Sequence, residues 1–252
     1  MALPAGHEPV DPVGWSLVER PDPRTASDPL EHATLHGFPL DLGTVLRTAA
    51  SALRGSKRVV LAGAAAWIAV TWLVGLVTFA MGLGELVSAS IGILATTPIT
   101  LGLLMVGVRR ARGEQVAVGD LLAHTGATAQ GAIVLLVNLL VLNAAEAVLG
   151  PVLSAPVILV YALFASFAPY LVADRGLDGF TAIGASFRLV RHRWGTLLAL
   201  QVLLGLGLAL AALPLGIGLI WAGPYAVVAL GAAFDAAVPA TLSTASKNTL
   251  SG

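Results

Sequence analysis

The feature that most constrains this chain is a series of apolar runs, each about 20 residues long, that recur from Val59 onward. A helix needs about 20 apolar residues to cross a hydrocarbon core roughly 30 Å thick. Only 11% of the residues are charged, and the mean hydropathy is +0.87, whereas about 25% are charged in a typical soluble domain. The sequence therefore predicts an all-α membrane protein with six transmembrane helices, at about 59–80, 86–108, 128–149, 152–173, 196–213 and 216–238.

The breaks within each pair of runs are short. Only tight turns fit at 82–85, 150–151 and 214–216, so the six spans are expected to pair as three hairpins. The second helix of each hairpin also carries a proline inside the span, which frees a backbone carbonyl and kinks the helix. These prolines are Pro98, Pro156 or Pro169, and Pro224.

Each hairpin is preceded by a more polar segment, and two of these segments are amphipathic. Their apolar residues follow the spacing of one helix face. They are Leu42, Val45, Leu46, Ala49 and Leu53 before the first hairpin, and Phe180, Ile183, Phe187, Val190 and Trp194 before the third. The middle segment, 116–122, is shorter. We expect interfacial segments that lie along the headgroups on the cytoplasmic side. The alternative is that they pack into a cytoplasmic cap. The order of interfacial segment, straight helix and kinked helix then occurs three times along the chain, and all three copies enter the membrane from the same side.

Basic residues gather on one side of this topology, since the three hairpin turns contain no Lys or Arg. By the positive-inside rule, the basic loops and both termini are cytoplasmic, and the chain is a multi-pass protein of the cell membrane. We expect the basic residues beside the spans to form a rim that meets anionic lipid headgroups or a partner protein. The rim comprises Arg47, Arg54, Lys57, Arg58, Arg109, Arg110, Arg112, Arg188, Arg191 and Arg193.

The first 40 residues differ in composition from the rest, because they hold seven of the fourteen prolines and no long apolar run. We expect a disordered acidic cytoplasmic tail at 1–40, a six-helix domain at 41–238 and a cytoplasmic C-terminal tail at 239–252. One apolar island in the first tail, with Trp15, Leu17 and Val18, has the character of a docking peptide that folds on a partner. The alternative is a patch that touches the protein's own cytoplasmic face.

Polar residues inside the spans are few. Asn138, Asn143 and Gln201 are expected to form hydrogen bonds between helices, because the polar residues of the third span do not share one face as the wall of a transport pathway would. Glu85, Glu146 and Asp235 lie near span ends, from which they reach an interface.

Several short stretches resemble a known family. They are Arg112-Gly113-Glu114, Gly119-Asp120-Leu121-Leu122, the segment 168–174 (APYLVAD) and, most strongly, the segment 179–190 (GFTAIGASFRLV), with Gly195 and Gly216-Ile217-Gly218 before Pro224. This pattern resembles a widespread bacterial group of six-helix integral membrane proteins, which includes stand-alone proteins and the membrane domain of some glycerophosphoryl diester phosphodiesterases. The resemblance implies a fold and a membrane location. These 252 residues lack the phosphodiesterase domain and its His/Glu ligand set, so the resemblance carries no hydrolase activity over.

The remaining chemistry argues against catalysis. The sequence contains no cysteine and no zinc-protease, serine-hydrolase or phosphate-loop motif, so we expect no enzyme activity, cofactor or metal. Its net charge is zero, so it lacks the positive charge that binds nucleic acid, and we expect no nucleic-acid partner. We expect an accessory or scaffolding subunit of a membrane complex, or an organiser of anionic lipid. The alternative is a transporter or channel component, and a lipid enzyme rests on the family resemblance alone. A wet cavity lined by Asn138, Asn143 or Gln201 would favour transport.

Overall fold

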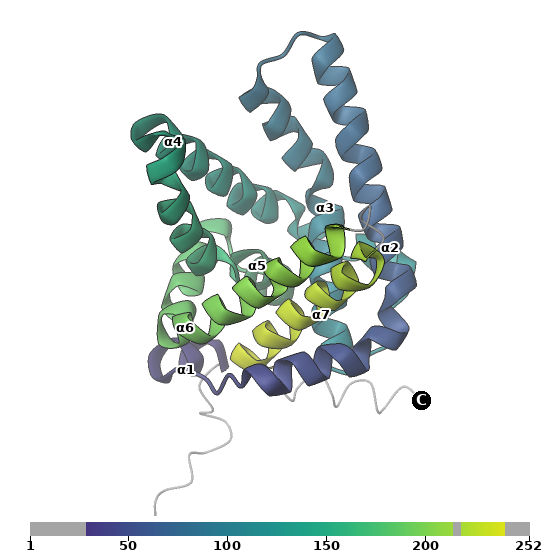
Figure 1. The fold of residues 1–252 in the computed structure, drawn as a ribbon, viewed down its shortest axis with the longest axis vertical. Helices are drawn as coiled ribbons and strands as arrows, with labels where there is room; N and C mark the ends of the chain where they lie inside the picture. Colours follow the sequence, from purple (N-terminus) through teal and green to yellow (C-terminus); the bar gives the residue numbers. More distant parts are fainter. Residues whose placement is uncertain (1–28, 214–217, 240–252) are drawn as a thin grey trace, which may run out of the picture.

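The computed structural model describes residues 29–213 and 218–239, without the side chains at 54–56. All regular structure in these ranges is helical (Figure 1). The elements are α1 (Pro29–His36), α2 (Leu42–Ala80), α3 (Glu85–Ala111), the 3-10 turns η1 (Val118–Leu122) and η2 (Thr125–Ala127), α4 (Thr128–Ala165), α5 (Ala168–Arg175), α6 (Gly179–Ala212) and α7 (Leu219–Ala237).

Five helical stretches among the described residues are long and apolar enough to cross a membrane. They are Lys57–Ala80, Glu85–Ala111, Val118–Arg175, Gly179–Ala212 and Leu219–Ala237. The all-helical architecture expected from the sequence is confirmed, and it is compatible with a multi-pass membrane protein. The expected third and fourth spans fall within one bent stretch instead of two separate helices.

The first amphipathic segment and the first span form one helix of 39 residues, α2. Asp41 caps its start, because its Oδ2 accepts a hydrogen bond from the Thr44 N–H at 2.7 Å. The beginning of α2 lies across the base of the molecule, and the helix then turns upward (Figure 1). Val45, Ala49 and Ala52 on its apolar face are buried in the core that α6 and α7 share. At Val45 and Ala49 this contact corresponds to the cap alternative, because the protein itself covers them, whereas Leu46 and Leu53 of the same stripe are half-buried.

The second amphipathic segment begins α6, and the protein covers part of its expected face, because Val190 is buried and Ile183 and Phe187 are half-buried. Ala182, Ala185 and Leu189 are buried, whereas Phe180 and Trp194 are 68% and 55% exposed. Small residues allow the neighbouring helices to approach closely, so the buried stripe lies beside the one marked by the large side chains.

Helix α4 bends at Gly150, whose φ of 72° and ψ of 168° interrupt the helix. Glycine adopts this positive φ without a Cβ clash, and Pro151 follows with no N–H to donate. The second half of α4 returns toward the first (Figure 1), and Tyr161 Oη donates a hydrogen bond to Asn138 Oδ1 at 2.8 Å across the bend. The expected turn at 150–151 is thus a sharp bend within α4.

The expected fourth span is interrupted before α5. Pro169 has no N–H and restricts the residue that precedes it, and the chain leaves the helix at Ser166 and Phe167. Ser186 from α6 bridges the break. Its buried hydroxyl donates to the Phe164 carbonyl at 2.6 Å and accepts from the Phe167 N–H at 3.1 Å. The break therefore leaves neither of these backbone groups unpaired.

Residues 29–40 belong to the folded body, which corrects the expected tail boundary. Ala33 and Phe38 are buried in the main core. Helix α6 departs from helical geometry at Arg193, whose Nε donates to the Phe38 carbonyl at 3.0 Å. His192 Nε2 lies 2.9 Å from the Thr34 carbonyl oxygen. The expected docking peptide with Trp15, Leu17 and Val18 lies outside the described residues, as does the C-terminal segment 240–252.

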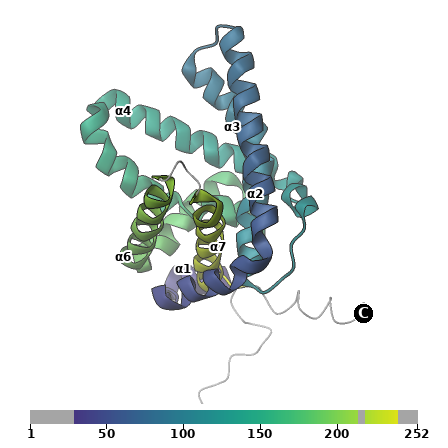
Figure 2. The same cartoon turned by 45° about the vertical axis from the view of Figure 1, so that its right-hand side comes forward.

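Two arms rise from this base. The paired ends of α2 and α3 form one arm, and α4 with its bend forms the other (Figures 1 and 2). Helices α6 and α7 lie below and between them. Helices α3 and α7 cross at two glycines, because a Cβ on Gly231 would lie 2.3 Å from the Gly107 carbonyl carbon. This crossing and the two arms position the sites described next.

Candidate functional site

The ends of three helices meet in one ion-pair network at the base, which we call the arginine hub. It consists of Arg112 at the end of α3, Asp174 and Arg175 at the end of α5, and Asp235 in the last turn of α7. Arg112 Nη1 lies 2.9 Å from Asp174 Oδ1, and Arg112 Nε lies 2.7 Å from Asp235 Oδ1. Arg175 Nε lies 3.2 Å from the other Asp174 oxygen. One guanidinium thus connects the second helices of the three expected repeats.

The hub is largely shielded from solvent. The Arg112 side chain is 15% exposed, Asp174 10% and Asp235 27%. Burial alone opposes the charge on Arg112, but its hydrogen bonds to Asp174 and Asp235 outweigh this effect and raise the pKa of the guanidinium. The group therefore stays charged at any physiological pH, and the hub has the properties of a fixed structural element and not of a proton carrier.

A second network lies beside the hub in the loop that follows α3. Arg109 pairs with Glu114 at 2.8 Å and with Asp120 at 3.1 Å. The Ala117 N–H donates to Asp120 at 2.7 Å, and this bond, together with Arg109, lowers the pKa of the Asp120 carboxyl despite partial desolvation. Three of the stretches that carry the family resemblance, 112–114, 119–122 and 168–174, contribute residues to these two networks.

His124 stands close to both networks. Its Nδ1 is buried without a hydrogen-bond partner among the described residues. Burial, and then the charge of Arg109, lower the pKa of this imidazole, while Asp174 and Asp120 act weakly in the opposite direction. The neutral form of His124 is therefore favoured in the folded protein.

The expected basic rim divides into two groups. Arg109, Arg110, Arg112 and Arg193 form hydrogen bonds within the protein, where Arg110 donates to the Ala52 carbonyl. These four arginines therefore stabilise tertiary contacts, in addition to any contact with lipid headgroups. Arg58, Arg188 and Arg191 are exposed without a partner among the described residues, and Arg47 bonds only within the first turns of α2. The side chain of Arg54 is not among those described.

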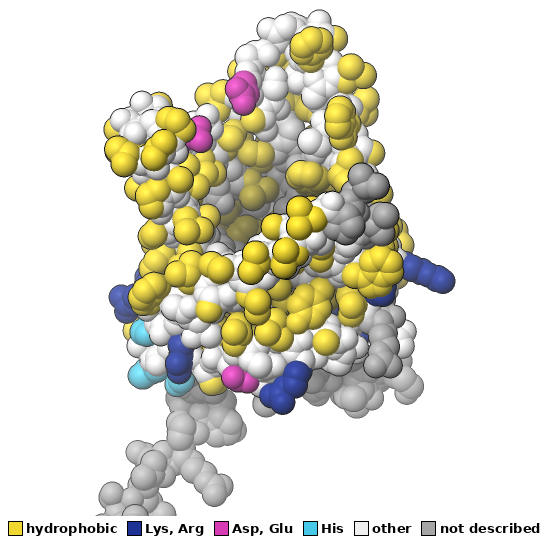
Figure 3. All heavy atoms as spheres, viewed as in Figure 1, with side chains coloured by type: hydrophobic (Ala, Val, Ile, Leu, Met, Phe, Trp, Pro, Cys, Tyr) yellow, Lys and Arg dark blue, Asp and Glu magenta, His cyan; other side chains and the backbone are white. Residues whose placement is uncertain are grey.

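A large apolar groove separates the two arms. Its volume is about 580 Å³, and Figure 3 shows the surface hollowed between the arms. Helices α2, α3, α4 and α7 contribute its walls. Polar side chains in the lining are Thr96, Thr100 and Asn138, and both threonine hydroxyls bond to carbonyls of their own helix. We call this feature the arm groove.

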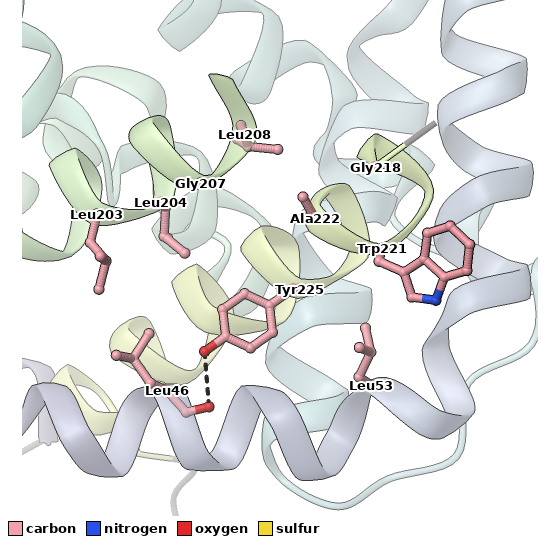
Figure 4. Close-up of a pocket in the computed structure, with 10 residues that line it drawn as sticks. All are labelled: Leu46, Leu53, Leu203, Leu204, Gly207, Leu208, Gly218, Trp221, Ala222 and Tyr225. Carbon is pink, nitrogen blue, oxygen red and sulfur yellow. Dashed lines mark hydrogen bonds between the residues drawn. The ribbon is translucent and has the colours of Figure 1, made fainter. Parts of the chain in front are cut away.

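A second pocket lies at the base, between the first turns of α2 and the helices α6 and α7 (Figure 4). Its volume is about 520 Å³, and its lining is almost entirely apolar. Tyr225 Oη donates to the Leu46 carbonyl at 3.1 Å and thereby ties α7 to α2 along one wall. We call this feature the base pocket. It is lined by Leu46, Leu53, Leu203, Leu204, Gly207, Leu208, Gly218, Trp221, Ala222 and Tyr225.

The polar residues singled out within the spans have different surroundings. Asn138 lines the arm groove and accepts the hydrogen bond from Tyr161 across the α4 bend. Asn143 Nδ2 donates to the Leu139 carbonyl of its own helix, which differs from the expected contact between helices. Gln201 is half-buried in α6 and has no side-chain hydrogen bond among the described residues. Neither Asn143 nor Gln201 lines the arm groove or the base pocket.

The sequence analysis did not predict that Asp174 and Asp235 both pair with Arg112, or that Ser186 bonds to the backbone at the break between α4 and α5. A signal for the hub exists in the sequence, because charged residues lie at the cytoplasmic end of the second helix expected in each hairpin. Within the described ranges, no three His, Asp or Glu side chains form a group that could hold a metal ion. No protein-family model, curated protein or solved structure matches this chain.

Proposed function

We propose that the chain is a six-span protein of the cell membrane with both termini in the cytoplasm. The family resemblance supports this topology, and so does the absence of Lys and Arg from 59–108 and 128–174. Figure 3 agrees for the face it shows, on which basic side chains lie around the base and not on the arms. In this topology the first half of α4 is the third span, and the second half of α4 together with α5 is the fourth.

Cysteine labelling tests the topology directly, because the chain contains no cysteine of its own. Gly84→Cys and Val148→Cys lie at the tips of the two arms, and Gln115→Cys lies in the loop after α3. A membrane-impermeant maleimide added to intact cells should label the first two positions and not the third. Labelling of Gln115→Cys from outside would overturn the topology.

For its activity, we propose a non-catalytic accessory or scaffolding subunit that receives a transmembrane helix of a partner protein in the arm groove. The observation that carries this proposal is the arm groove itself, with its splayed walls and its single amide side chain. Among the helices that wall the groove, α2 and the stretch that contains α4 are covered least, with 17% and 11% of their most apolar windows buried, against 44% for α3 and α7; α6, outside the groove, is also at 17%. Two of the four walls of the groove, α2 and α4, therefore have much apolar surface left to bind.

Asn138 favours a protein partner over lipid chains in the arm groove. Its Oδ1 is held by Tyr161, while its Nδ2 has no acceptor among the described residues. An amide donor that faces hydrocarbon is unfavourable, and a hydrogen bond to a neighbouring transmembrane helix contributes about 0.6–2 kcal/mol. A partner helix with a backbone or side-chain oxygen at this depth would satisfy the donor, whereas an acyl chain offers no acceptor.

The lining of the arm groove gives less support to a transporter. A transport pathway needs polar groups along its length, whereas Asn138 is the one amide among the described residues that line this groove, and the two threonine hydroxyls are bonded to their own helix. The groove also opens sideways between the arms, toward the hydrocarbon in the proposed topology.

Photo-crosslinking in native membranes tests the proposed docking. A photoreactive amino acid at Ile93, inside the arm groove, should give a protein adduct of one discrete mass. The same group at Leu206, an exposed position on α6 outside both pockets, should give lipid adducts. Asn138→Leu should weaken the protein adduct while the protein still folds. Lipid adducts at both positions would refute partner docking, and a flux that Asn138→Leu abolishes would favour transport.

A further inference from the structure

The base pocket is an apolar recess at the level where α2 turns from the base into the arm. Leu46 and Leu53 come from the first turns of α2, Leu203 and Leu204 from α6, and Trp221 from α7. Figure 4 shows these side chains arranged around an open space between the three helices. A volume of about 520 Å³ lies within the range of small-molecule and lipid sites.

The hollow exists because the α6 and α7 walls carry small residues. A Cβ built on Gly207 would meet no atom within 4 Å, so the space in front of this glycine is empty. At Gly218 the opposite holds, because a Cβ there would lie 2.6 Å from the Ala211 carbonyl oxygen. The contact between α6 and α7 therefore closes the recess near Gly218, while the wall at Gly207 stays open.

A cation stands at the edge of this apolar recess. Lys57 Nζ lies 5.3 Å from the centroid of the Trp221 ring, which is within cation–π distance. Lys57 follows Leu46 and Leu53 at a spacing of eleven and four residues on α2, so the three share one helix face. Beside it, Arg58 is exposed, and within the described residues no carboxylate pairs with either cation.

We propose that the base pocket binds one anionic phospholipid, with an acyl chain in the recess and the phosphate beside Lys57. The occupant follows from charge complementarity. An acyl chain matches the leucine-lined hollow, and the anionic phosphate matches a lysine whose stem crosses the apolar surface to the headgroup level. This site goes beyond the proposed partner docking, because it uses a different pocket and a different ligand.

Tryptophan quenching by brominated lipid tests the site, because Trp221 is part of its wall. The protein is made with Trp15, Trp67, Trp72 and Trp194 replaced by Phe, and reconstituted into phosphatidylcholine vesicles. Dibrominated phosphatidylglycerol or dibrominated phosphatidylcholine is then added in equal molar fraction. Half-maximal quenching should need roughly fivefold less of the brominated phosphatidylglycerol, the ratio that corresponds to about 1 kcal/mol per basic residue near an anionic headgroup.

Two pairs of variants in this background separate the pocket from general lipid contact. Gly207→Leu fills the empty space and should remove the preference, whereas Gly205→Leu, on the same helix but outside the lining, should keep it. Lys57→Gln should remove the preference, while Arg58→Gln removes an equal charge from the next position and should change it little. Size-exclusion elution verifies that each variant is folded.

A reference chain that keeps only Trp72 measures ordinary lipid contact. This side chain is 76% exposed on the α2 arm and should be quenched equally by both lipids. Equal quenching of Trp221 by the two lipids, unaffected by Gly207→Leu, would overturn the specific site. Absence of quenching at Trp221, with Trp72 quenched normally, would also overturn it, because another part of the protein or a partner would then fill the pocket.

Discussion

The glycine crossing of α3 and α7 gives the sharpest prediction about what holds the molecule together. In Gly231→Ala, the new Cβ would lie 2.3 Å from the carbonyl carbon and 2.6 Å from the carbonyl oxygen of Gly107. These are backbone atoms, so no side-chain rotation relieves the contact. The helices must separate by about 1.1 Å to restore an ordinary carbon contact of roughly 3.4 Å.

This separation of the helices would also lengthen the contact between Arg112 and Asp235 in the arginine hub. Asp235 lies one helical turn beyond Gly231, and Arg112 lies five residues beyond Gly107, so the ion pair is close to the crossing. A shift of about 1.1 Å takes the 2.7 Å contact between Arg112 Nε and Asp235 Oδ1 to nearly 3.8 Å, past hydrogen-bond distance. Overpacking costs about 1–3 kcal/mol, and loss of a charge-assisted hydrogen bond costs about 1.5–3 kcal/mol more.

Alanine is also a better helix former than glycine by about 1 kcal/mol, which partly offsets these losses. Gly231→Ala should therefore destabilise the fold by about 2–4 kcal/mol and lower the Tm of the detergent-solubilised protein by on the order of 10 °C. The matched control is Gly223→Ala on the same helix, because a Cβ there meets no atom within 4 Å. Its stability should be unchanged or higher.

A double-mutant cycle tests the link between the crossing and the hub. If Gly231→Ala already breaks the ion pair, adding Asp235→Asn should cost less than Asp235→Asn costs alone, with a coupling of about 1 kcal/mol. Additive effects would show that the helices yield at the glycine without disturbing Arg112. Equal Tm values for Gly231→Ala and Gly223→Ala would refute the reasoning from the close contact altogether.

Four further substitutions test other contacts, each by thermal unfolding in detergent. Arg112→Leu should cost about 2–3 kcal/mol, because it leaves two shielded carboxylates without their cation. Ser186→Ala should cost about 1–3 kcal/mol, since the buried Phe167 N–H and the part-buried Phe164 carbonyl at the α4–α5 break lose their partner. Tyr170→Phe should stabilise the fold by up to about 1 kcal/mol, because the buried hydroxyl has no partner among the described residues. Burial lowers the pKa of His124 in the folded state, so this residue contributes its full share to the stability of the fold above about pH 6.5, and this stability is lost as the pH falls through the folded pKa. His124→Gln should therefore reduce the drop in Tm between neutral and mildly acid pH.

The sequence predicts the helical architecture well, because hydrophobic periodicity and run length depend on the chain alone. The turn at Gly150 also follows from local chemistry, since glycine adopts a positive φ and the Pro151 that follows has no N–H to donate, although the pair Gly223-Pro224 stays within α7. The break at Ser166 and Phe167 is harder to foresee. Pro169 indicates that some interruption is possible, but its position depends on Ser186, which is distant in sequence and becomes a neighbour only in the folded chain.

The sites depend even more on tertiary contacts. Arg112 and Arg58 are equivalent as residues beside a span, and the positive-inside rule treats both as basic rim. The fold gives Arg112 two carboxylates and leaves Arg58 exposed without a partner among the described residues. The apolar face of the first α2 turns similarly cannot reveal what covers it. A stripe such as Val45 and Ala49 suits a headgroup surface or a protein core, and the packing of α6 and α7 decides between them.

The arginine hub and the glycine crossing together specify how α3, α5 and α7 align. Between apolar membrane helices, burial contributes little preference for one register over another, because lipid and leucine surfaces are alike. A displacement of α7 along α3 by one turn, about 5.4 Å, would move Gly231 away from Gly107 and Asp235 out of reach of Arg112. A shielded ion pair adds little net stability, but it penalises every arrangement that leaves its charges unpaired. We therefore expect hub variants such as Asp235→Asn to lose a unique packing, seen as broadened cysteine-crosslinking patterns between α3 and α7, before they lose helix content.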